Sequence, residues 1–133
     1  MHALAFYKSA TTDQLISELK QGLPTNLFDE LRQDLDLSDN ALSGILLISK
    51  RTLDRRRETG RLKTDESDRV LRLIRVYNKA VEVFDDKEEA TSWLKKPARG
   101  LGGQIPLTYA DTEPGAHEVI ALLDRIDHGV FPG

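Results

Sequence analysis

Apolar side chains recur at helical intervals along most of the chain, and this spacing constrains the fold more than any other feature. The longest run lies in residues 64–84, where apolar residues follow one another at steps of four, three, four and three. Such steps place side chains on one face of a helix. The members of this apolar seam are Val70, Ile74, Tyr77, Val81 and Phe84. No segment alternates apolar and polar residues as a strand does, so we predict an all-α helical bundle.

Capping and breaking residues predict the limits of the other helices. A short helix should end at Gly22, a second should cover residues 27–35, and Ser38 and Ser49 should cap two more, the last ending at Gly60. Asp86 with Glu89 fits a capping box. A final helix should run from about residue 114 to 128. Residues 97–106, with three glycines and two prolines, should form a loop, either compact or flexible.

Charge is distributed unevenly. The net charge of the chain is −3, but residues 1–49 carry −4, residues 50–75 carry +5 and residues 80–133 carry −5. Contact with phosphate requires local positive charge. We therefore expect two domains: residues 1–62, with a helix-turn-helix region for DNA, and residues 63–133, a helical domain for dimerisation and for another partner.

The basic segment has the pattern of a helix-turn-helix motif. One short helix ends near Leu47, and a second begins after Ser49 with cations and hydroxyls in its first turns. In such motifs the start of the second helix faces the major groove. The predicted DNA-binding residues are Ser49, Lys50, Arg51, Thr52, Arg55, Arg56 and Arg57. The alternative is a solvated basic helix on the bundle surface.

Nothing in the sequence supports catalysis. Cysteine is absent, and His2, His117 and His128 are too scattered for a metal site. The glycines of residues 100–103 lack the lysine and hydroxyl residue of a phosphate loop. We therefore expect a protein that is not an enzyme and has no metal or cofactor. No apolar run is long enough to span a membrane, and the N-terminus is a poor signal peptide, so we expect a cytoplasmic location.

An ordered series of motifs resembles the Xre-type antitoxins of the Xre/MbcA/ParS toxin-binding family. It runs from residues 51–56 through 60–69, 80–94 and 97–107 to 115–130. The resemblance implies a cognate RES-domain toxin, an NAD-consuming enzyme neutralised by direct contact that blocks its active site. It also implies repression of the pair's own promoter. One departure is Leu47, where the family usually has glycine at the turn; a left-handed leucine costs about 1 kcal/mol.

With this resemblance, residues from about 106 to 133 are predicted to contact the toxin. The predicted toxin-binding residues are Glu113, Glu118, Asp124, Asp127, His128, Val130 and Phe131. We expect a homodimer along the apolar seam, because helix-turn-helix proteins bind two-fold operators. The alternatives are that the seam is the core of a single chain, that the last helix only packs in the core, and that the protein is a stand-alone regulator without a toxin.

Overall fold

The computed structural model describes residues 7–129, and all regular structure in that range is helical. The only strand-like features among those residues are two isolated bridges, between Pro24 and Arg61 and between Ala98 and Gln104. The predicted all-α class is therefore confirmed. The chain forms two compact units, residues 1–74 and 75–133. They meet inside the long helix α6 (Thr64–Phe84), whereas our predicted boundary lies in the loop before it.

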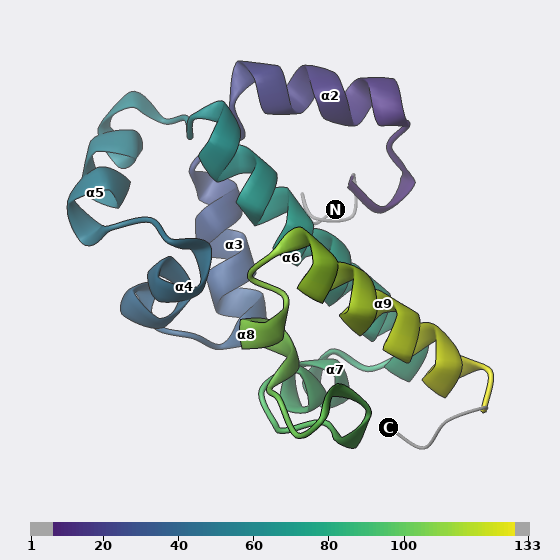
Figure 1. The fold of residues 1–133 in the computed structure, drawn as a ribbon. Helices are drawn as coiled ribbons and strands as arrows, with labels where there is room; N and C mark the ends of the chain where they lie inside the picture. The colour runs from purple at the N-terminus through teal and green to yellow at the C-terminus, as the bar shows by residue number, and fades with distance from the viewer. Residues whose placement is uncertain (1–6, 130–133) are drawn as a thin grey trace. The chain divides into compact units, whose positions relative to one another are not determined.

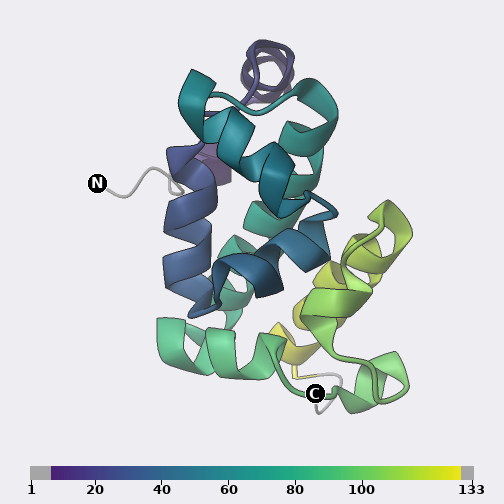
Figure 2. The same cartoon turned by 90° about the vertical axis from the view of Figure 1, so that its left-hand side faces the viewer.

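Helices α2 to α5 and the first half of α6 lie in the described part of the first unit. The short helices are α2 (Thr12–Gln21), α3 (Asn26–Leu35), α4 (Asp39–Leu46) and α5 (Lys50–Thr59). Figures 1 and 2 show α4 and α5 joined by a tight turn. Fully or almost fully buried apolar side chains from each of α3, α4, α5 and α6 form its core, among them Phe28, Leu42, Leu53 and Ile74.

The predicted helix ends in this unit are confirmed. The hydroxyl of Ser38 accepts a hydrogen bond from the backbone N–H of Ala41, and the hydroxyl of Ser49 accepts one from that of Thr52. Each satisfies a backbone donor that the first helical turn leaves unpaired. Gly60 ends α5 in the left-handed region at φ 83°. The leucine-rich faces of amphipathic helices thus explain the core, and the serine caps explain where α4 and α5 begin.

The second unit contains the end of α6, helix α7 (Lys87–Leu94), a 3₁₀ turn η1 (Arg99–Leu101), the short helix α8 (Pro106–Tyr109) and α9 (Glu113–Asp127). Asp86 caps α7 as predicted, accepting bonds from the N–H groups of Glu88 and Glu89. The loop at residues 97–106 is compact, because Ala98 N–H donates to the Gln104 carbonyl at 2.9 Å. We did not predict α8.

The apolar seam of α6 is largely occupied by the fold of one chain. Val70, Ile74 and Tyr77 are buried, while Val81 and Phe84 are half-buried. The ring of Phe84 lies 5.8 Å from that of Trp93 on α7. Three of the five predicted dimer-interface residues are therefore not accessible to a second copy in this conformation. Their burial agrees with the alternative that the seam belongs to the core of a single chain.

Candidate DNA-binding and toxin-binding surfaces

The turn between α4 and α5 keeps the geometry of a helix-turn-helix even though leucine stands at its centre. Leu47 adopts the left-handed conformation, with φ 57° and ψ 40°, and its side chain is 70% exposed. The N–H of Ile48 bonds to the carbonyl of Ser43 at 3.0 Å, which closes α4. Ile48 itself is buried. The turn is thus formed at a cost of about 1 kcal/mol in backbone strain.

The outer face of α5 carries the accessible part of the predicted DNA-binding set. Ser49, Lys50, Arg51 and Arg55 are exposed, and Thr52 is half-buried. Arg51 and Arg55 lie four residues apart and so project from the same face. Neither has a hydrogen-bond or ion-pair partner among residues 7–129. Their guanidinium groups are thus not committed to internal contacts in that part of the chain.

Arg56 instead points into the unit and holds α5 against α6. Its guanidinium group donates to both carboxylate oxygens of Glu66, at 2.7 and 3.0 Å. The side chains are only 16% and 8% exposed. Glu66 also accepts the N–H of Lys63 at 2.9 Å, which caps the start of α6. Burial alone would raise the pKa of Glu66, but these hydrogen bonds outweigh it and the pKa lies below its ordinary value.

Arg57 is held inside the unit as well. It bonds to Asp29 on α3 at 2.6 Å and to Asp39 on α4 at 3.1 Å, and it lies 5.5 Å from the ring centre of Phe28. The hydrogen bond between Arg57 and Asp39 raises the pKa of the arginine and lowers that of the aspartate. Arg56 and Arg57 therefore set the position of α5, and the outward cations are Lys50, Arg51 and Arg55.

Two contacts that position this surface were not foreseen. The first is the ion pair between Glu66 and Arg56. The second is the hydrogen bond that Arg69 Nε donates to the carbonyl of Leu46 at 2.7 Å. That carbonyl belongs to the last turn of α4, where cations are favourable. The available signal for Glu66 was its place three residues after Lys63, where a glutamate commonly reaches back to the helix start.

The predicted toxin-binding residues of α9 fall into separate groups. Glu113, Glu118, Asp127 and His128 are exposed, whereas Asp124 pairs with Lys79 on α6 at 2.5 Å. The hydrogen bond from Lys79 lowers the pKa of Asp124. Glu118 lies roughly 120° around the helix from Asp124, since each residue advances by about 100°. Val130 and Phe131 lie outside the described residues.

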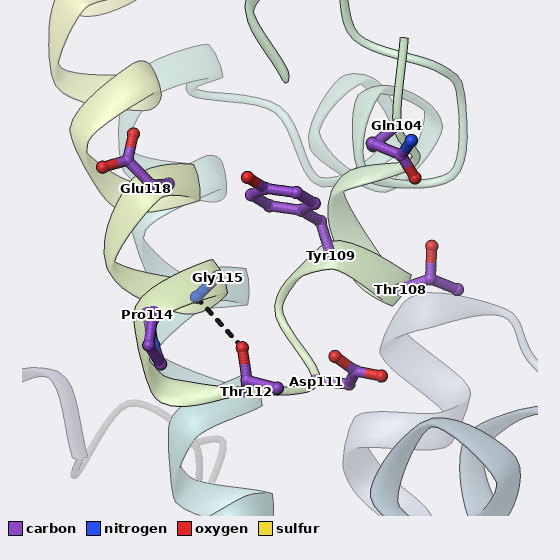
Figure 3. A pocket seen from close by; sticks show the side chains of 8 residues that line it. All are labelled: Gln104, Thr108, Tyr109, Asp111, Thr112, Pro114, Gly115 and Glu118. Carbon is purple, nitrogen blue, oxygen red and sulfur yellow. Dashed lines mark hydrogen bonds between the residues drawn. The ribbon is translucent and has the colours of Figure 1, made fainter. Parts of the chain in front are cut away.

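Glu118 lines a pocket of about 390 Å³ between α8 and the start of α9 (Figure 3). The opposite wall includes the ring of Tyr109, which is 37% exposed. Thr112 caps α9 by accepting the N–H of Gly115 at 3.2 Å. A side chain at Gly115 would place its Cβ 1.7 Å from the Tyr109 carbonyl oxygen, so glycine is required for this close approach.

Residues 7–129 offer no group of three or more His, Cys, Asp or Glu side chains that could hold a metal ion. Within the same range, none of the helices is both long and apolar enough to cross a bilayer. The two candidate sites are the basic face of α5 and the exposed acidic and aromatic surface of α8 and α9.

Comparison with known proteins identifies the domain that contains each surface. Residues 14–75 match the antitoxin Xre-like helix-turn-helix domain, and residues 79–129 match the antitoxin Xre/MbcA/ParS C-terminal toxin-binding domain. The antitoxin Xre of Photorhabdus laumondii is 36% identical over 126 residues, covering 93% of this chain and 85% of that protein. The antitoxin Xre of Yersinia enterocolitica is 35% identical over 119 residues, covering 88% and 80%.

A more distant relative is the Prs ADP-ribosylating antitoxin of a Sphingobium species, 26% identical over 137 residues, which cover 96% of this chain and 86% of that protein. The expectation that the chain is not an enzyme agrees with its family, which is one of antitoxins. The chain belongs to the Xre antitoxins, with a helix-turn-helix DNA-binding domain followed by a toxin-binding domain.

Proposed function

We propose that this antitoxin neutralises a RES-domain toxin, an enzyme that consumes NAD, by covering the entrance to its active site. The observation that carries the proposal is the match of residues 79–129 to a toxin-binding domain, together with the exposed acidic residues of α9. A cleft that binds an anionic dinucleotide should be electropositive at its mouth, and acidic side chains complement such a rim.

The name of the Sphingobium relative supports the chemistry of this partner. That protein is called a Prs ADP-ribosylating antitoxin, and any ADP-ribosyl transfer takes its ADP-ribose from NAD, so its name points to chemistry that uses the same dinucleotide. In the cytoplasm, where we expect the pair to act, a free toxin of this kind would deplete a central cofactor. Rim carboxylates would mainly speed association, whereas apolar anchors would govern how long the complex lasts.

We further propose that the chain represses its own operon as a dimer. The outward cations of α5 would contact operator DNA, with Arg51 and Arg55 reaching base edges. The Ser49 hydroxyl donates to that of Thr52, which leaves the Thr52 hydroxyl free to donate to a phosphate. A two-fold operator calls for two copies of the recognition helix. Light scattering tests the dimer: we expect about twice the 15.0 kDa of one chain at micromolar concentration, and a monomer both alone and in the toxin complex would refute it.

Co-expression tests the central proposal. The chain should co-purify with the product of the adjacent reading frame, and cells carrying both should keep their NAD. Two variants probe the contact surface: deletion of residues 129–133, and replacement of Asp127 by lysine. Asp127 forms no hydrogen bond or ion pair among residues 7–129, although its charge helps to raise the pKa of Lys79. Asp127→Lys is preferred to reversal of Asp124, which would also break the pair with Lys79. If both variants fold and still suppress NAD loss, residues elsewhere block the toxin.

A chain that binds the promoter but captures no product of the adjacent reading frame would instead be a stand-alone regulator. A promoter shift assay on the purified chain, run beside the pull-down, separates these two outcomes.

A further inference from the structure

The pocket between α8 and α9 is large enough to receive a side chain of a partner. Its volume of about 390 Å³ falls within the range of roughly 300–1,000 Å³ that is typical of ligand sites. Every residue that lines it lies between 104 and 118, so the pocket is formed within the second unit. The toxin-binding domain match spans all of these residues.

The pocket is held open by rigid local structure. Gly115 lets the first turn of α9 pack against the carbonyl of Tyr109, and the Thr112 cap fixes the same turn. Pro106 and Leu107 are buried and anchor α8. Tyr109 is the residue of this short helix whose large side chain is left partly exposed, and its ring extends from α8 toward α9 (Figure 3). A preformed site loses less conformational entropy on binding.

The acidic lining of the pocket favours a positively charged group. The carboxylates of Asp111 and Glu118 line it, and no lysine or arginine does. Glu118 forms no hydrogen bond or ion pair with any other residue between 7 and 129. The start of α9 contributes about half a positive charge, and the Thr112 hydroxyl already takes one of its N–H groups. The full negative charge of Glu118 outweighs that half charge.

The aromatic wall narrows the choice of cation. Arginine is planar, stacks on aromatic rings and pairs with carboxylates through two parallel hydrogen bonds, whereas lysine is a strongly hydrated point charge. A cation over a tyrosine ring is attracted to the negative face of the ring, and the attraction strengthens when water is excluded. We propose that this pocket receives an arginine side chain of the toxin, held between the ring of Tyr109 and the carboxylate of Glu118.

This inference rests on the proposed function, because it assigns the pocket's occupant to the toxin. The experiment uses the full-length chain and the RES-domain protein encoded beside it, the latter inactivated at its own active site. Dissociation constants are measured by calorimetry for wild type, Glu118→Gln, Tyr109→Leu and the control Glu88→Gln. Glu88 is an exposed acid in the first turn of α7, outside the pocket.

We expect Glu118→Gln to weaken binding at least about tenfold, since a hydrogen bond to a charged group contributes about 1.5–3 kcal/mol. Tyr109→Leu should weaken it as well, and Glu88→Gln should have no effect. Circular dichroism melting curves establish that each variant is folded. Because Glu118 is exposed and has no hydrogen bond or ion pair among residues 7–129, its replacement should leave the melting temperature unchanged.

The identity of the occupant is tested by replacing each surface arginine of the toxin with alanine. One of these replacements should weaken binding to the wild-type antitoxin but cause no further loss with Glu118→Gln, and lysine at that toxin position should not restore affinity. If folded wild type, Glu118→Gln and Tyr109→Leu bind the toxin equally well, the proposed role of the pocket is wrong but the proposed function is not. Failure of the wild-type chain to bind the toxin would overturn both proposals. Coupling of Glu118 to a toxin lysine would also overturn the assignment.

Discussion

Helices α5 and α9 both carry rows of charged residues, but they use that charge in different ways. On α5, Arg56 and Arg57 are bound to Glu66, Asp29 and Asp39 inside their own unit. On α9, the acidic residues Glu118 and Asp127 are exposed and form no hydrogen bond or ion pair among residues 7–129. A charged residue in a binding helix therefore serves either to position that helix or to meet a partner, and the number of charges alone does not distinguish the two.

The largest expected effect concerns the outward cations of α5. Arg51→Ala with Arg55→Ala should reduce promoter affinity at least about 30-fold, since each lost base contact costs about 1–3 kcal/mol. Stability should not change, because neither side chain has an internal partner among residues 7–129. Fluorescence anisotropy at several salt concentrations measures the affinity. Tight, unaltered binding at every salt concentration would mean that α5 is only a solvated basic face.

The inward arginines should show the opposite behaviour. Glu66→Ala should lower the free energy of unfolding by about 3 kcal/mol, because it leaves Arg56 partly buried without its counter-charge and removes a cap of α6. Urea denaturation measures this change. The isosteric control Glu66→Gln should lose less, since it keeps the shape and one acceptor. If Glu66→Ala is as stable as wild type, the pair does not hold α5 in place.

The same pair predicts a dependence on pH. The pKa of Glu66 is lower in the folded chain than its ordinary value. A lowered carboxyl pKa contributes stability that is fully present above the unfolded pKa, about 4.3, and is lost as the pH falls through the folded pKa. The stability gap between wild type and Glu66→Gln should therefore be full at pH 7 and shrink below about pH 4. A gap that stays constant into acid would contradict the role of charge.

A substitution beside the pocket of the second unit should change the free energy of unfolding by less than Glu66→Ala does. Gly115→Ala should cost about 2 kcal/mol, because the new Cβ would lie 1.7 Å from a backbone oxygen and α8 would have to move. Gly44→Ala is a matched control on α4, where a Cβ meets nothing within 4 Å. Thermal unfolding compares the two variants. Equal melting temperatures would show that α8 is not tightly packed against α9.

Much of this fold could be predicted from the sequence because its signals are local. The spacing of apolar residues predicted the extent of α6, and the hydroxyls of Ser38 and Ser49 predicted where α4 and α5 begin. Arg56 and Arg57 could not be assigned in the same way, because their partners lie as far as 28 residues away and only the folded chain brings them together. The short helix α8 has too few residues for a periodic signal, so its pocket was missed as well.

The smallest effect expected concerns the turn of the helix-turn-helix. Leu47→Gly should raise the free energy of unfolding by up to about 1 kcal/mol, because glycine adopts φ 57° without strain, less the entropy that glycine adds to the unfolded chain. Urea denaturation measures it, with Leu47→Ala as the control that retains the strain. Destabilisation by glycine but not by alanine would show that Leu47 is not strained in the native turn.

The central claim is that the two binding functions occupy separate surfaces of one chain, and a paired binding measurement tests it most directly. Promoter affinity and toxin affinity are both determined for Arg51→Ala/Arg55→Ala and for Glu118→Gln. We predict that the arginine variant loses the promoter and keeps the toxin, while the glutamate variant loses toxin affinity and keeps the promoter. A folded variant that loses both affinities, or a glutamate variant that loses only the promoter, would contradict the account.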